Sequence, residues 1–270
     1  MLGGVTHVRV ATLNLWSVGG VWDGRRDVLR SGFRSLQPDL IAFQEAYLTA
    51  DRDTVREILD PELHVAHQTG GLLGDGNCAA IASRWPLLDV TELDQQLGPR
   101  TADFPVTTIV AEVDVPAPIG PVLFVNHLPS WKPQLEHERE LQTVATAKFV
   151  EELVAERRRH VVLAGDLDAV PKAASIRFLR GLQSLGGTSV SYRDAWETIH
   201  PGDPVDTFTL RNPLMRRTAT SCRKGPGGST TSSSVPTSMG RASRSQAVSC
   251  CSTSPWTASG RATTSVWSRS

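Results

Sequence analysis

Cysteine is scarce in this chain of 270 residues, and the scarcity excludes a disulfide-stabilised fold. Only four residues are Cys, and Cys78 is the single one within residues 1–217, where no C-x-x-C pair suggests structural zinc. No apolar run approaches the ~20 residues of a membrane-spanning helix. The first residues lead into a short apolar run without the basic segment of a signal peptide. We therefore expect no membrane span, a cytoplasmic location and a monomeric protein.

Acidic side chains are absent from the last 53 residues, although the whole chain carries 28 Asp and Glu against 28 Lys and Arg. Residues 1–217 hold all the acidic residues and 22 of the basic ones, for a net charge of −6, while residues 218–270 have a net charge of +6. Ser and Thr make up 24 of those 53 residues, which is typical of a disordered tail. We therefore divide the chain into a domain, residues 1–217, and an anomalous tail, residues 218–270.

Strand and helix patterns alternate throughout residues 1–217. A period of two predicts a strand at residues 7–16, and short apolar runs predict strands at 39–45, 78–83, 107–115, 121–126 and 161–164. Apolar residues on one face predict helices at 25–36 and 134–159, with another helix at 174–182. This interleaving indicates an α/β or α+β domain with mixed sheets.

Polar residues follow four of the predicted strands, at the point where each strand ends. They are Asn14, Gln44–Glu45, Asn126–His127, and Asp166 with Asp168. Strand ends of α/β proteins collect catalytic groups, so these side chains could converge at one edge. Carboxylate and amide oxygens suit Mg²⁺ or Mn²⁺, which usually act on phosphate oxygens.

Each of these residues also has a purely structural explanation. Asn14 could bond to neighbouring backbone, and Glu45 could cap the next element. His127 could be a hydrogen-bonded core histidine, and Asp166 and Asp168 could be turn-forming aspartates. The group is therefore more informative than any member of it.

Taken together and in order, five segments resemble the endonuclease/exonuclease/phosphatase superfamily. They are Thr12–Trp16, Asp39–Glu45, Asn126–His127, Gly165–Asp168 and Tyr192–Trp196, and Ser83–Pro86 is similar to a further segment of that family. The resemblance covers roughly residues 8–215. It implies a DNase I-like, four-layer sandwich in which two mixed β-sheets pack face to face between outer helices.

The resemblance also implies the roles of individual residues in a Mg²⁺- or Mn²⁺-dependent phosphoester hydrolase. Glu45 would be the direct metal ligand with help from Asn14, which would also bind the substrate. His127 would contact the scissile phosphate, and Asp166 would orient or deprotonate the attacking water. Asp168 stands where the family usually has Asn; it can still coordinate metal, but it adds a negative charge beside an anionic substrate. Asp194 and Trp196 match a structural segment near the site.

Two C-terminal motifs of the family are missing from residues 218–270: a strand of the type R-I-D-Y-V-F, and a final S-D-H that carries the acid/base His. We therefore expect the C-terminal strands to be missing. If serines use TCN codons, regrouping the codons of residues 228–235 permits I-D-Y-V-F-V-R, and regrouping those of residues 260–265 permits A-S-D-H-F. We therefore hypothesise a frameshift near Arg216–Thr220.

Two other interpretations of the chain stay open. It could be a degenerate, non-catalytic family member that binds metal or a phosphorylated ligand. The motif matches could also be chance, in which case Asn14, Glu45, His127 and Asp166 would lie scattered in space. The substrate stays undetermined between a small phosphoester, a lipid head group and nucleic acid, although the −6 charge of the domain argues against tight non-specific DNA binding.

Overall fold

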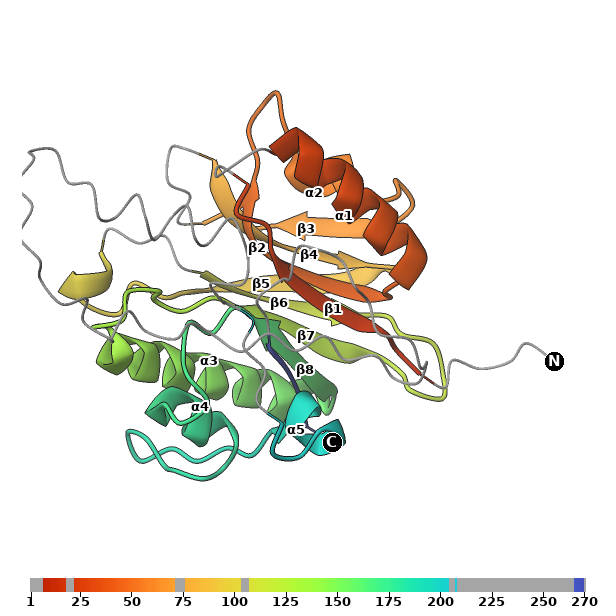
Figure 1. Cartoon of the computed structure of the whole chain (residues 1–270). Helices are drawn as coiled ribbons and strands as arrows, with labels where there is room; N and C mark the ends of the chain where they lie inside the picture. Colours follow the sequence, from red (N-terminus) through yellow and green to blue (C-terminus); the bar gives the residue numbers. More distant parts are fainter. Residues whose placement is uncertain are drawn as a thin grey trace, which may run out of the picture.

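The computed structural model describes residues 7–17, 22–70, 76–102, 107–203, 207 and 265–269. Two β-sheets pack face to face, and helices cover their outer faces (Figure 1). This is the four-layer arrangement of mixed sheets that the sequence predicts. None of the helices in the described ranges is long and apolar enough to cross a membrane.

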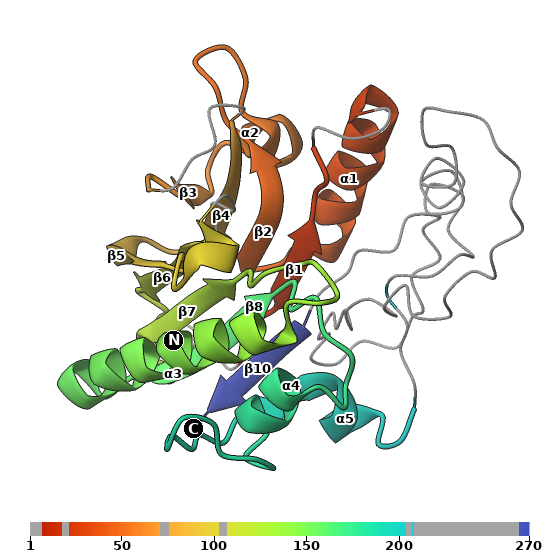
Figure 2. The same ribbon diagram turned by 90° about the vertical axis from the view of Figure 1, so that its left-hand side faces the viewer.

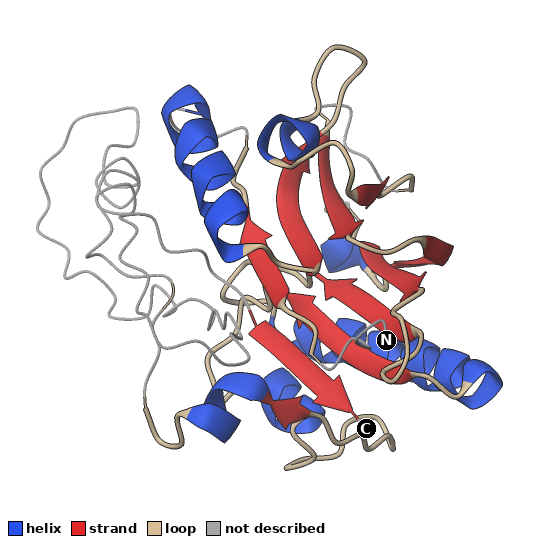
Figure 3. Ribbon diagram, turned by 90° about the vertical axis from the view of Figure 1, so that its right-hand side faces the viewer, coloured by secondary structure: helices blue, strands red, loops and turns tan. Residues whose placement is uncertain are grey.

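The first sheet has the strand order β1-β2-β4-β3, which the labels of Figure 2 follow. Figure 3 shows the strands in red and the helices in blue. Its strands are β1 (Val10–Asn14), β2 (Leu40–Tyr47), β3 (His64–His67) and β4 (Asn77–Ser83). Strands β1 and β2 are parallel, and β4 runs antiparallel to both β2 and β3. The outer face packs against α1 (Trp22–Leu36) and α2 (Thr54–Ile58). The parallel pair brings the carboxyl ends of β1 and β2 to the same edge.

The second sheet has the strand order β5-β6-β7-β8-β10-β9. Its strands are β5 (Leu87–Asp94), β6 (Thr107–Val113), β7 (Val122–His127), β8 (His160–Gly165), β9 (Arg193–Asp194) and β10 (Ser265–Arg269). Its helices are α3 (Glu136–Arg157), α4 (Ala174–Leu179) and α5 (Ala195–Ile199), and a short 3₁₀ helix, η1 (Pro99–Thr101), follows β5. Strands β7 and β8 are parallel, so His127 and Gly165 end side by side.

The core between the sheets explains why the run at residues 39–45 is continuously apolar. Leu40 and Ala42 of β2 face the second sheet and pack with Phe124 of β7, whereas Ile41 and Phe43 face the helices α1 and α2. All four of these β2 side chains are at most 1% exposed. A strand that is buried on both faces needs apolar residues at every position, so it shows no alternation.

Most predicted elements are present with shifted ends. The observed elements that were not predicted are the strands β3, β5, β9 and β10, the short helices α2 and α5, and η1. Helix α1 begins three residues before the predicted start, and α4 ends three residues before the predicted end. Strands β3 and β5 lie at the outer edges of their sheets and were not predicted. Much of β5 is half-buried or exposed and carries three acidic residues, so its sequence lacks a clear apolar pattern.

The C-terminal tail differs from the expectation in one respect. Residues 265–269 form β10, which lies beside β8 (Figure 2). It stands between β8 and β9 in the sheet and pairs antiparallel with both. One C-terminal strand is therefore present where we expected none, because the short Val-Trp pair favours strand and β8 offers an unpaired edge. Residues 208–264, which include the predicted frameshift point and the three tail cysteines, lie outside the described residues.

Candidate active site

Asn14, Glu45 and Asp166 meet where the two sheets come together. The Asn14 side-chain amide nitrogen, Nδ2, donates to Glu45 Oε1 at 2.8 Å and to Asp166 Oδ2 at 2.9 Å. Asn14 and Glu45 come from parallel strands of the first sheet, and Asp166 follows β8 of the second. Three of the predicted site residues therefore lie within hydrogen-bond distance although they are up to 152 positions apart in the chain, which rules out a scattered arrangement of these three.

Glu45 reaches this group through a break in its strand. The pairing of β2 with β4 shifts between Phe43 and Ala46, and Glu45 has a φ of +49°. This left-handed backbone is costly for a residue other than glycine, and such strain clusters at functional sites. A β-bulge re-aims the side chain of the residue that it contains. The bulge therefore places Glu45 toward Asn14 at the edge of the sheet.

The carboxylates at this edge repel one another. Burial and the neighbouring charge of Asp166 raise the pKa of Glu45, although the hydrogen bond from Asn14 acts in the opposite direction. Burial, followed by the charges of Asp166 and Glu45, raises the pKa of Asp168 well above its ordinary value, while the Arg139 charge opposes the shift. Asp168 also has a left-handed backbone, with a φ of +45°. The edge is thus rich in negative charge and short of positive charge.

This chemistry fits a hard divalent cation held by a small ligand set. Glu45 and Asp166 supply carboxylate oxygens, which are ligands that such a cation prefers. In this structure the partly positive N–H hydrogens of the Asn14 amide face both carboxylates. Within the described part of the chain, no three His, Cys, Asp or Glu side chains form a metal-binding group. The ligand roles that we expected for Glu45, Asn14 and Asp168 therefore stay predictions.

His127 ends β7 and is completely buried. Its Nδ1 lies 2.8 Å from Thr108 Oγ1 and 3.2 Å from Thr146 Oγ1. Burial lowers the pKa of His127 to about 3, so the ring is neutral at neutral pH. The other ring nitrogen, Nε2, is buried without a hydrogen-bond partner among the described residues.

Asn126 and Gln44, which adjoin the predicted site residues, bind the two sheets together. Asn126 Nδ2 donates to the carbonyl oxygens of Phe43 and Ala80 at 2.8 and 2.9 Å, and Gln44 Nε2 donates to Asn126 Oδ1 at 2.7 Å. All of these groups are buried, so the bonds satisfy polar atoms that would otherwise destabilise the core. Asn126 and Gln44 therefore have a structural role, which is to join the two sheets.

Asp194 and Trp196 belong to the short helix α5 and the strand before it. Asp194 caps α5 by accepting a hydrogen bond from the Glu197 N–H at 3.1 Å. The Trp196 ring lies 4.1 Å from the ring of His200, and its Nε1 donates to the Asp203 carbonyl at 3.2 Å. These contacts suit the structural role that we expected for both residues.

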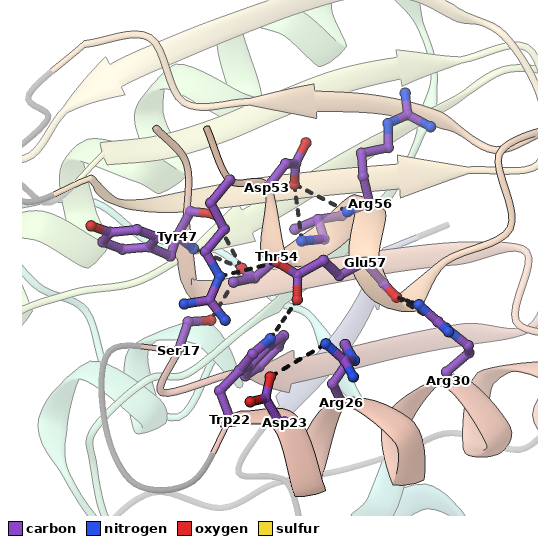
Figure 4. Close-up of polar contacts among 12 residues, drawn as sticks. Ser17, Trp22, Asp23, Arg26, Arg30, Tyr47, Asp53, Thr54, Arg56 and Glu57 are labelled. Atoms are coloured by element: carbon purple, nitrogen blue, oxygen red, sulfur yellow. Dashed lines mark hydrogen bonds and ion pairs between the residues drawn. The ribbon is translucent and has the colours of Figure 1, made fainter. Parts of the chain in front are cut away.

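Thr54 of α2, which we did not single out from the sequence, joins the loop after β1 to the last residue of β2 (Figure 4). Ser17 Oγ donates to Thr54 Oγ1 at 3.2 Å, and the Tyr47 N–H donates to the same oxygen at 2.9 Å. Ser17 lies three residues after Asn14, and Tyr47 lies two after Glu45. A single hydroxyl thus holds both strand ends in register just beyond the site.

Arg25 of α1 also escaped sequence reasoning. Its guanidinium donates to the carbonyl oxygens of Leu15 and Trp16 at 2.7 and 2.9 Å, and it lies 5.6 Å from the Trp16 ring. The Trp16 N–H in turn donates to Asn14 Oδ1 at 2.9 Å, which fixes the direction of the Asn14 amide. No local pattern signals this role, because the partners of Arg25 are backbone oxygens ten and nine residues away.

Comparisons with known proteins agree with this architecture. The model of the Endonuclease/Exonuclease/phosphatase family matches residues 11–242, which extends past the resemblance that we expected and into the Ser/Thr-rich segment. No curated protein matches the sequence.

Solved structures share the fold at low sequence identity. A humanized D. rerio TDP2 is 15% identical over 76% of this chain and 77% of its own, with a TM-score of 0.56. The human Nocturnin catalytic domain with bound sulfate is 11% identical over 92% and 75%, with a TM-score of 0.56. A Bacteroides thetaiotaomicron mannosyl-6-phosphatase is 17% identical over 71% and 74%, also with a TM-score of 0.56. Since the family model covers most of the chain, this protein belongs to the endonuclease/exonuclease/phosphatase family.

Proposed function

We propose that this domain hydrolyses a phosphoester with Mg²⁺ or Mn²⁺ held by Glu45 and Asn14. The observation that carries the proposal is the contact of Asn14 Nδ2 with both Glu45 and Asp166, because it joins the expected ligands to the expected base. When bound, the cation would neutralise the negative charge that develops on the phosphoryl oxygens.

Asp166 is the group that we assign to the attacking water. The Asn14 hydrogen bond orients one of its carboxylate oxygens, and an oriented carboxylate can accept a proton from a water molecule that lies in line with the leaving group. Asp168, two residues further on, has a pKa raised well above its ordinary value by burial and by the charges of Asp166 and Glu45, so its charged form is disfavoured unless a cation binds beside it. The carboxyl groups of the site therefore favour binding of the cation over binding of the anionic substrate.

His127 would donate from its ring to a phosphoryl oxygen. Its neutral state at neutral pH leaves one N–H per ring, and Nε2 has no competing partner within the described ranges. Because the ring is fully buried, this contact requires local opening of the structure around it. His127 is therefore a phosphate-binding residue in this proposal, and not the acid that protonates the leaving group.

The tail bears on whether this polypeptide turns over substrate. We propose that the domain of residues 1–217 is C-terminally incomplete, and that residues 218–270 are the product of a frameshift near Arg216–Thr220 that replaced its last strands. The absent S-D-H motif and the Asp at position 168 favour the alternative, a non-catalytic family member that binds metal or a phosphorylated ligand. Serine codons of the AGY type at residues 229–234 would contradict the frameshift.

A phosphodiesterase assay tests the activity directly. The full chain and a version with the alternate frame restored are compared on bis(p-nitrophenyl) phosphate with Mg²⁺ and with chelator. We expect Mg²⁺-dependent cleavage by the restored chain, and a loss of at least 100-fold in Glu45→Gln, because one ligand charge is removed. The exposed Glu62→Gln is the matched control and should retain full activity. Undiminished metal-dependent activity in Glu45→Gln would show that the metal lies elsewhere.

A further inference from the structure

The loop Ser130–Pro133, which connects β7 to α3, is fixed by a buried arginine. The Arg139 guanidinium donates to the carbonyl oxygens of Ser130 and Lys132 at 2.8 Å each and to that of Pro133 at 3.2 Å. Its side chain is only 5% exposed and also pairs with Glu136 at 2.8 Å. Three backbone carbonyls bound to one rigid, planar group leave this loop little conformational freedom.

Despite that rigid support, the loop presents a tryptophan to solvent. Trp131 is 52% exposed, and the ammonium group of Lys132 lies 6.0 Å from the centre of its ring. The neighbouring Ser130 is buried, and its Oγ has no hydrogen-bond partner among the described residues. A large ring that is held in place but not packed into the core provides a flat, preorganised surface for a ligand.

The loop lies at the edge that carries the candidate active site. Ser130 is three residues after His127, the last residue of β7, and that residue pairs with Gly165, directly before Asp166. Arg139 acts on the pKa of Asp168 through its charge. Helix α3 also begins beside α4 (Figure 2), where Glu136 accepts a hydrogen bond from Ser175 Oγ at 3.0 Å. One helix start therefore connects the Ser130–Pro133 loop to the chain that follows Asp168.

We propose that the Ser130–Pro133 loop is the subsite for an aromatic base on the phosphoester substrate. Trp131 stacks on the base, and Lys132 attracts the adjoining phosphate. The inference rests on the proposed function, since it assumes that a phosphate binds at the neighbouring carboxylates. A nucleotide combines the two chemistries that the loop displays, a planar π-face and an anion.

Binding of two small probes tests the proposal without requiring turnover. Adenosine 5′-monophosphate and ribose 5-phosphate share the sugar phosphate and differ only in the base. Titration calorimetry of the full chain in Mg²⁺ should show that the adenosine compound binds on the order of tenfold more tightly, the usual effect of one base stacking on an aromatic side chain. Trp131→Ala should abolish this difference and leave the affinity for ribose 5-phosphate unchanged, whereas Trp131→Phe should keep most of it.

Two further variants sharpen the test. Leu88→Ala removes a similarly exposed apolar side chain. Leu88 lies near the start of β5, at the end of the sheet that is away from His127 and the Ser130–Pro133 loop, so the change should alter neither affinity. Lys132→Gln should weaken both ligands alike at low salt, because both carry the phosphate. Equal shifts of both affinities in Trp131→Ala would contradict the stacking role.

The failures of the two proposals are distinguishable. If both probes bind the wild-type chain equally well, the base subsite is overturned while the phosphate site stands. If neither probe binds, both proposals are overturned.

A further experiment measures binding to phosphatidylcholine vesicles, because Leu97 and Val170 are also exposed. Equal probe affinities together with vesicle binding that Trp131→Ala abolishes would assign the loop to a lipid surface and overturn the base subsite.

Discussion

Three of the five non-glycine residues with left-handed backbone in the described ranges lie around the candidate active site. Trp16, Glu45 and Asp168 have φ values of +45°, +49° and +45°. Trp16 lies two residues after Asn14, Glu45 lies within β2, and Asp168 lies two residues after Asp166. Each such residue costs on the order of 1 kcal/mol or more, so the surrounding contacts must hold it in place. Arg25 on the Trp16 carbonyl is one of those contacts. The site is therefore maintained by residues that do not themselves belong to it.

His127 makes the stability of the protein depend on pH. Its pKa falls to about 3 in the folded chain, against an ordinary value of 6.5, so protonation favours the unfolded state. The contribution of the neutral ring to the free energy of unfolding is complete above pH 6.5. It is lost as the pH falls from 6.5 toward 3, at about 1.4 kcal/mol per pH unit. Urea unfolding of the wild type and of His127→Gln across pH 7 to 4 measures this. The free energy of unfolding should fall less steeply in the variant, and parallel curves would contradict the buried, neutral ring.

Some of the site could be predicted at the level of residues and some could not. Asn14 and Glu45 each fall at the end of a predicted strand, and parallel strands bring such ends together, so their meeting was predictable. Asp166 follows a strand of the other sheet, and only the resemblance to a known family placed it beside them. The bulge at Glu45 was not, because it depends on pairing with β4, which lies 32 or more residues further along the chain. The structural use of Asn126 was hidden for the same reason, since its partners are backbone oxygens of the other sheet.

At the scale of elements, β7 and β8 approach so closely that only glycine fits between them. A Cβ atom on Gly165 would lie 1.8 Å from the carbonyl oxygen of His127. Gly165→Ala must therefore push apart the two strands that carry His127 and Asp166. We expect the free energy of unfolding to fall by about 2 kcal/mol or more, as measured by thermal and urea unfolding.

Gly98→Ala is the matched control for this prediction. The space around Gly98 holds no atom within 4 Å of the added Cβ, and its backbone is extended. The control should change stability by less than about 0.5 kcal/mol. Equal stability of the two variants would mean that β7 and β8 can separate without cost.

The central elements were easier to predict than the edges. Strand β2 and helix α3 have long, uniform patterns because their positions are buried on two faces or on one continuous face. Strands β3 and β5 lie at sheet edges and are partly exposed, so apolar and charged residues mix in them. Edge strands of this kind depend on their neighbours rather than on their own sequence.

At the scale of the whole molecule, β10 is the part of the C-terminal segment that contributes to the second sheet. It supplies the partner of both β8 and β9 in the second sheet. A chain that ends after residue 217 should therefore expose the edge of β8, unfold at a lower urea concentration and aggregate more readily. Urea unfolding and light scattering of the full and shortened chains make the comparison. Unchanged stability would contradict this contribution of β10 and show that residues 218–270 add nothing to the fold.

The contact of Asn14 with Asp166 spans the two sheets, and this has a consequence for the order of events during synthesis. Asn14 and Glu45 are made early, but their partner is made 152 residues after Asn14. A ribosome-bound chain that has not yet extruded and packed β8 holds only half of the group. The group of Asn14, Glu45 and Asp166 therefore cannot assemble on a nascent chain before the second sheet has docked on the first.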